Sequence, residues 1–137
     1  MKYNPLCALS CALLAITLLL SGCDSSQIEG REPEKIFGDQ GLGPGQFVYP
    51  RAISIAPDGT VFVVDKTARI QRFNPDGEYE IHWQMPQWTA GKPTGITVDD
   101  EGRVLVADTH YHQVIIYDRE GNEQARFGSL GEGAGQF

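Results

Sequence analysis

Basic charge and catalytic signatures are both scarce in this sequence of 137 residues. It has 18 acidic residues against 11 basic ones, which gives a formal net charge of −7. A surface of that sign repels a phosphate backbone, so we expect no binding to nucleic acid. The sequence also contains no nucleophile elbow and no H-E-x-x-H run. We therefore predict no catalytic residues, no metal ligands and no cofactor.

Cysteine is equally rare, and all three cysteines lie near the amino terminus. Cys7 and Cys11 fall inside an apolar run at residues 6–20, which follows the single positive charge of Lys2. The run is shorter than the roughly 20 residues that cross a bilayer as a straight helix. It therefore predicts a signal peptide over residues 1–22, with an uncleaved membrane helix and a buried Cys23 as the alternative.

The run ends in "LSGC", which resembles the lipobox of bacterial lipoproteins. The resemblance implies that Cys23 is lipidated and anchors the chain in a bacterial membrane, facing the periplasm or the cell exterior. Residues 23–33 would then be the lipidated cysteine and a flexible tether, because they are polar and lack apolar periodicity. Asp24 resembles the signal that keeps enterobacterial lipoproteins in the inner membrane.

Repetition is the main feature of the remaining chain. "FGDQGLGPGQF" at residues 37–47 returns 90 positions later as "FGSLGEGAGQF" at residues 127–137. Residues 50–83 likewise align with residues 93–127 at an offset of 43 that becomes 44 after one insertion. Each unit holds four short alternating runs separated by Asp-Gly or Glu-Gly turns, and none has helical periodicity. This pattern predicts an all-β fold of propeller blades.

The run "VLVADTHYHQVIIYDREGNEQARFG" and the following "GEGAGQF" resemble an NHL repeat. The resemblance implies a partial β-propeller over residues 34–137, with two four-stranded blades and a leading edge strand at residues 33–38, after an N-terminal signal helix. The first unit departs from the family pattern, because Ala52 replaces a glycine and the connector at residues 83–93 lacks the glycine-rich frame. Since NHL repeats usually close six-bladed rings, we expect a truncated or split propeller that self-associates or lacks its remaining blades.

Two aspartates occupy the same place in the two units, at the end of the second strand. Asp65 and Asp108 are candidates for a ligand or cation site on one rim of the propeller. The alternative is structural, because short acidic side chains accept backbone N–H groups in the turn that follows.

Other candidates lie on neighbouring loops. His110 and His112 form an H-x-H pair, but two imidazoles do not fix a transition metal, and His112 also matches a histidine of the repeat. Arg51 and Thr94 flank the first strands, near the channel mouth of a propeller. Two tryptophans and a tyrosine offer an apolar recognition surface, although we expect Trp83 to pack between blades; the others are Trp88 and Tyr111.

Two classes of function fit these observations. The first is a membrane-anchored, non-catalytic binding module for a protein, peptide or glycan. The second is a metal-dependent propeller enzyme of the amidating-lyase or lactonase type, which would hold a divalent cation in its channel. We favour the binding module, because the sequence assembles no recognisable catalytic site.

Overall fold

The computed structural model describes residues 32–90 and 92–137. This part of the chain is all-β, as predicted, and contains no helix. The expected signal peptide, Cys23 and nearly all of the tether lie outside the described residues. A search of the described residues for a helix of membrane-spanning length and hydrophobicity found none.

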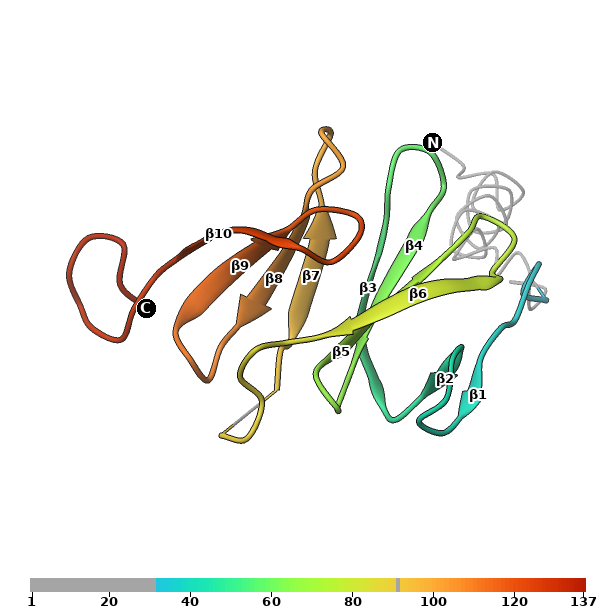
Figure 1. Cartoon of the computed structure of the whole chain (residues 1–137), viewed down its shortest axis with the longest axis horizontal. Helices are drawn as coiled ribbons and strands as arrows, with labels where there is room; N and C mark the ends of the chain where they lie inside the picture. Colours follow the sequence, from blue (N-terminus) through green and yellow to red (C-terminus); the bar gives the residue numbers. More distant parts are fainter. Residues whose placement is uncertain (1–31, 91) are drawn as a thin grey trace, which may run out of the picture. The chain divides into compact units, whose positions relative to one another are not determined.

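Eight strands form two four-stranded antiparallel sheets, which we call the first and second blade (Figure 1). The first blade contains β3 (Pro50–Ile55), β4 (Val61–Asp65), β5 (Arg69–Phe73) and β6 (Tyr79–Gln84). The second blade contains β7 (Gly95–Val98), β8 (Val104–Asp108), β9 (Gln113–Tyr117) and β10 (Glu123–Phe127). Strands lie side by side in chain order within each blade, so every connection is a hairpin. Equivalent positions differ by 43 up to β4 and β8 and by 44 from β5 and β9 onward.

The hairpins divide the connections between two ends of each blade. One end, which we call the turn rim, carries the tight turns at residues 56–60, 74–78, 99–103 and 118–122. Gly59 has φ +86° there, a conformation that favours glycine, and its N–H donates to the Ala56 carbonyl at 2.9 Å. The other end, which we call the loop rim, carries residues 48–51, 66–68, 85–90, 92–94 and 109–112 (Figure 1).

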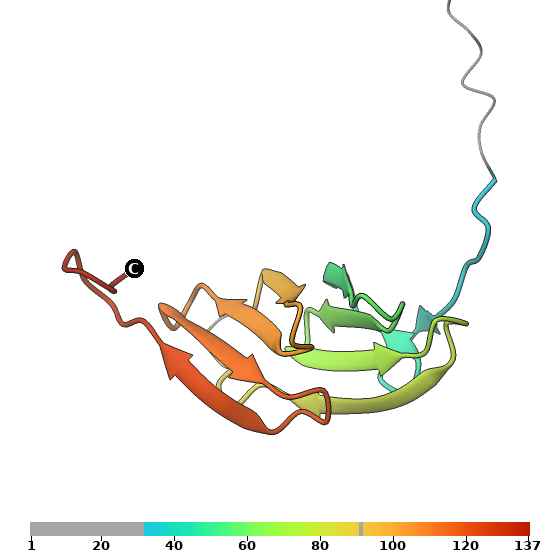
Figure 2. The same cartoon turned by 90° about the horizontal axis from the view of Figure 1, so that it is seen from above.

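The larger of two hydrophobic clusters in the described chain lies between the two blades. Phe62, Val64 and Ile70 of the first blade pack with residues of the second blade, namely Val104, Val106, Ile115 and Tyr117. Strands β3 and β7 lie close to each other across this contact (Figure 2). The Trp83 ring lies 6.3 Å from Phe62 and 5.7 Å from Tyr117, centroid to centroid, so it packs between the blades as expected.

The first glycine-rich loop, residues 37–47, folds against the opposite side of the first blade. Its strands β1 (Asp39–Gln40) and β2 (Gln46–Phe47) pair in parallel. The Phe37 and Phe47 rings lie 5.0 and 5.5 Å from Phe73, where they cover a second, smaller apolar cluster. The leading strand expected at residues 33–38 is not formed, because no described strand pairs with these residues and supplies the hydrogen bonds that a strand requires.

Candidate functional site

The first glycine-rich loop is held by three buried polar side chains, which we call the clamp: Asp65 at the end of β4, and Arg69 and Gln71 on β5. The Arg69 Nη2 lies 3.2 Å from Asp65 Oδ2, with side-chain exposures of 6% and 0%. Buried charges of this kind require a partner, and each supplies it for the other. The ion pair therefore permits Arg69 to reach into the loop from the protein interior.

The clamp binds main-chain atoms of the loop. Arg69 donates to the carbonyls of Leu42, Gly43 and Gln46. Gln71 makes a reciprocal pair of bonds, since its Nε2 donates to the Gln46 carbonyl at 2.7 Å and its Oε1 accepts from the Gly45 N–H at 3.0 Å. These contacts fix the loop against the blade without depending on the loop's side chains.

Asp65 also stabilises the chain around it. Its Oδ1 accepts the Thr67 N–H at 2.8 Å, and its Oδ2 accepts the Val48 N–H at 3.2 Å. The bond from the Thr67 N–H is the one expected if Asp65 stabilises the turn that follows it. Together with the bond from Arg69, it gives both carboxylate oxygens a partner within the protein. Asp65 thus lies at the loop rim but does not face solvent there.

Asp108 has the same place in the second blade but different surroundings. Gln113 replaces Arg69 and Ile115 replaces Gln71, so Asp108 has no ion-pair partner at these positions of the described chain. Gln113 Nε2 lies 3.3 Å from Asp108 Oδ2, while Oδ1 is buried without a hydrogen-bond partner in the described structure. Burial raises the pKa of Asp108, and the Gln113 hydrogen bond partly offsets that effect. The expected backbone bonds of the following turn are not made by this carboxylate.

The remaining predicted residues come to the loop rim at the surface. Arg51, Thr94 and His110 are exposed there, and His112 is half-buried with φ +53°. His110 Nδ1 lies 3.4 Å from Thr109 Oγ1. Across the described residues, no three His, Cys, Asp or Glu side chains are grouped so that they could hold a metal ion.

Sequence reasoning missed two cation–aromatic pairs on this rim. Lys66 Nζ lies 5.0 Å from the centre of the Tyr49 ring, and Lys92 Nζ lies 5.0 Å from the Trp88 ring. Tyr49 and Trp88 are both exposed. The only signal in the sequence was an aromatic residue near a proline, in "VYPR" and in "QWTAGKP". Nothing in the sequence indicated that a lysine lies over either ring.

Tyr111 connects two loops of the rim. Its hydroxyl accepts the Ala90 N–H at 2.9 Å and lies 3.3 Å from Thr89 Oγ1. Both bonds lower the pKa of Tyr111, and the bond with Thr89 has the larger effect. The connector between the blades is therefore tied to the β8–β9 turn, and the rim has a defined surface.

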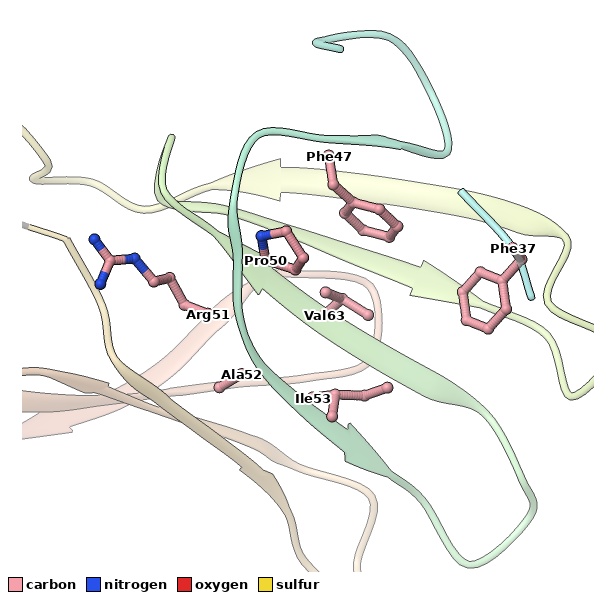
Figure 3. A pocket seen from close by; sticks show the side chains of 7 residues that line it. All are labelled: Phe37, Phe47, Pro50, Arg51, Ala52, Ile53 and Val63. Carbon is pink, nitrogen blue, oxygen red and sulfur yellow. The ribbon is translucent and has the colours of Figure 1, made fainter. Parts of the chain in front are cut away.

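A hollow of about 350 Å³ opens beside the first blade, next to the rim (Figure 3). Arg51 lies at one end, and the rings of Phe37 and Phe47 lie toward the other. Its other lining residues are apolar, namely Pro50, Ala52, Ile53 and Val63.

Comparison with known proteins agrees with this architecture. Residues 91–117 match the family model of the NHL repeat. The chain contains an NHL repeat. The matched repeat spans β7 to β9 and therefore includes Asp108, His110 and His112 of the loop rim.

Two relatives show how far the likeness extends. Protein brain tumor of Drosophila melanogaster is 30% identical over 95 residues, which is 67% of this chain but 9% of that protein. Virginiamycin B lyase from Staphylococcus aureus superposes with a TM-score of 0.51 at 19% identity, over 61% of this chain and 28% of that one. Together with the NHL repeat, the two antiparallel sheets make the described residues a partial β-propeller.

Proposed function

We propose that this propeller module is a non-catalytic binding module whose ligand-binding surface is the loop rim. We further propose that a lipid on Cys23 holds it at a bacterial membrane, with the propeller facing the periplasm or the cell exterior. Its partner in this proposal is a protein or peptide that presents carboxylates beside apolar side chains.

The distribution of charge between the two rims carries the proposal. The chain has a formal net charge of −7, and its turn rim is acidic, with Asp58, Asp76, Asp100, Glu101 and Glu120 all exposed. On the loop rim the situation is reversed, because Asp65 and Asp108 are buried whereas Arg51 and Lys66 are exposed. The described residues of the loop rim thus expose cations and no carboxylate, which is a surface suited to a partner of opposite charge.

The exposed aromatic rings give this surface its second property. Tyr49 and Trp88 are rigid, amphipathic side chains of the kind that dominate the energy of binding interfaces. Each carries a lysine ammonium over its ring, so cationic and apolar contacts are offered side by side. A carboxylate-bearing peptide with an apolar residue next to the charge fits that combination.

The membrane anchor rests on the "LSGC" motif and the apolar run before it. A lipid with several acyl chains attaches a protein durably, at about 0.8 kcal/mol for each buried methylene group. A clickable fatty acid should therefore label the wild-type chain and leave Cys23→Ser unlabelled. Equal labelling of both chains would refute the anchor without affecting the proposed binding surface.

The binding surface is tested by photocrosslinking in cells that express the full chain. We expect p-benzoylphenylalanine in place of Trp88 to give adducts, and the same residue in place of Glu101 on the turn rim to give few. Arg51→Ala should weaken the Trp88 adducts, because it removes a cation from the rim. Equal adducts from both rims would contradict the proposal.

The second function class, a metal-dependent enzyme, requires ligands beyond His110 and His112. Titration of the full chain with zinc distinguishes the two classes. A tight one-to-one site that is lost in His112→Ala would favour the enzyme, whereas weak heat that is unchanged in His112→Ala would favour the binding module.

A further inference from the structure

We propose that the second glycine-rich loop, residues 127–137, docks into the clamp of a second copy of this chain and replaces that copy's own first loop. The first blade of the second copy then stacks on the second blade of the first copy. The result is a head-to-tail contact between copies, which goes beyond the binding function proposed above.

The second loop already has the backbone conformation of the docked first loop. Gly131 and Gly135 have φ +151° and +75°, against +153° and +72° for their counterparts Gly41 and Gly45. The Gly133 N–H donates to Gln136 Oε1 at 2.8 Å, as the Gly43 N–H does to Gln46 Oε1 at 2.9 Å. Because the loop is formed before it docks, little conformational entropy remains to be lost on binding.

The clamp can accept either loop, because it recognises main-chain atoms. Arg69 and Gln71 contact the backbone of residues 42, 43, 45 and 46, whose counterparts are residues 132, 133, 135 and 136. The side chains that differ between the loops at those positions, Leu42 and Glu132, take no part in these bonds. Exchange of one loop for the other therefore preserves the hydrogen bonds of the clamp.

Within residues 32–90 and 92–137, the second loop has no such partner. No described atom outside its chain neighbours lies within 4 Å of a Cβ built on Gly135. Phe127 and Phe137 are 50% and 54% exposed and contact each other at 6.5 Å between centroids. Their counterparts Phe37 and Phe47 both pack on Phe73. The second loop thus exposes the same pair of aromatic rings that the first loop packs against Phe73.

The open face of the first blade supplies the other half of the contact. Ile53 and Ile55 are 59% and 63% exposed. Their counterparts in the second blade, Ile96 and Val98, pack in the core between the blades. The first blade therefore presents the surface by which the second blade binds its neighbour. A copy whose second blade covered this surface would repeat the contact that the chain already makes within itself.

Both halves of the contact lie on one chain but on different faces, so the association is heterologous. Such contacts run head to tail and either close into a ring or continue as a filament. The self-complementary pair, an open blade face and a preformed loop, identifies a second copy of this chain as the occupant.

An engineered disulfide tests this geometry. A Cβ built on Gly45 lies 3.6 Å from Tyr79 Cβ, within the range of about 3.5 to 4.5 Å that a disulfide spans. In the exchanged contact Gly135 takes the place of Gly45. We therefore combine one tagged full chain carrying Gly135→Cys with a differently tagged full chain carrying Tyr79→Cys. In both, the native thiols are removed by Cys7→Ser, Cys11→Ser and Cys23→Ser.

We expect oxidation to produce a disulfide-linked species that carries both tags. Adding Ile53→Lys and Ile55→Lys to the Tyr79→Cys chain should reduce its yield about tenfold, because two charges would be buried by the stacked blade. These isoleucines are exposed, so the substitutions leave the separate chain folded.

A single chain with Gly45→Cys and Tyr79→Cys provides the matched control, because its intrachain disulfide reports a folded clamp with the same strained cysteine. If this control forms its disulfide and the mixed species does not appear, the proposal is overturned. A mixed species whose yield is unaffected by Ile53→Lys and Ile55→Lys would overturn it too, since the blades would not be stacked. If this face instead binds a blade of another protein, no mixed species forms, and that result also overturns the proposal.

Discussion

The two blades share strand order and turn chemistry, yet the polar side chains at the ends of their inner strands are arranged differently. In the first blade, Asp65 is neutralised by Arg69 and both act on the glycine-rich loop. In the second blade, Asp108 is buried with one oxygen unpaired, next to Gln113. An aspartate repeated at the same strand end is therefore a structural anchor in one blade and a source of instability in the other. Repetition of a residue does not imply repetition of its role.

The difference follows from what precedes each blade. The first blade receives a glycine-rich loop whose carbonyls can accept from a buried arginine. The connector before the second blade lacks that frame, and its Gln87 lies 3.2 Å from Gln113. An arginine at position 113 would need other acceptors for its buried donors. The loss of the loop and the change from Arg69 to Gln113 are thus coupled features, and Tyr111 ties down the connector instead.

The largest expected difference between the blades concerns Arg69. We expect Arg69→Ala to lower the free energy of unfolding by about 3 to 5 kcal/mol, because it leaves Asp65 buried without its ion-pair partner. Gln113→Ala, the matched change in the second blade, should lower it by about 1 kcal/mol, since two long hydrogen bonds, to Asp108 and to Gln87, are lost. Urea unfolding of both full chains measures this. Equal losses would show that the clamp contributes no more than its counterpart.

The aspartates themselves should respond with opposite signs. Asp65→Asn should lower the free energy of unfolding at pH 7 by about 2 kcal/mol, because charge-assisted hydrogen bonds are lost. Asp108→Asn should raise it by about 1 kcal/mol, because the neutral amide avoids burial of an incompletely paired carboxylate.

The pH dependence provides an independent check on Asp108. Because burial raises its pKa in the folded state, folding favours its protonated form. Its stabilising effect is therefore present below the ordinary aspartate pKa and is lost as the pH rises through the raised pKa. Asp108→Asn should remove this loss of stability in urea unfolding measured from pH 3 to pH 7, and Asp65→Asn should not. A parallel profile for Asp108→Asn and the wild type would contradict the interpretation.

The strands were predictable from the sequence, and the clamp was not. Alternating apolar residues and glycine turns are local signals, so all eight blade strands could be located before the structure. The bonds from Arg69 and Gln71 to the loop join residues 23 to 27 positions apart, and in "RIQRF" these two side chains resemble ordinary exposed positions of a strand. The leading strand at residues 33–38 was predicted wrongly for the converse reason: its sequence resembles a strand, but a strand forms only where a partner supplies hydrogen bonds.

The smallest predicted effect lies on the turn rim. There the second blade supplies an arginine that pairs with an aspartate of the first blade, and the first blade has no arginine at the equivalent position. Arg119 Nη2 lies 2.6 Å from Asp58 Oδ2 of the first blade, whereas the residue equivalent to Arg119 in the first blade is Pro75. The hydrogen bond from Arg119, followed by that from the Thr60 N–H, lowers the pKa of Asp58 to about 2.

We expect Arg119→Ala to move the Asp58 midpoint, measured by carboxyl NMR, upward from about 2 toward its usual value of 3.8. It should stop short of that value, because the Thr60 N–H still donates to Asp58 Oδ1 at 3.1 Å. A lowered pKa stabilises the fold above the ordinary aspartate pKa and ceases to do so as the pH falls through about 2. Arg119→Ala should therefore be less stable than the wild type at neutral and mildly acidic pH, and the difference should disappear below about pH 2. Arg103→Ala is the matched control, because Arg103 lowers the pKa of Asp99 within the second blade, and that variant should leave Asp58 unchanged. A shift of Asp58 in the control, or none in Arg119→Ala, would mean that the two turn rims are not joined by this ion pair.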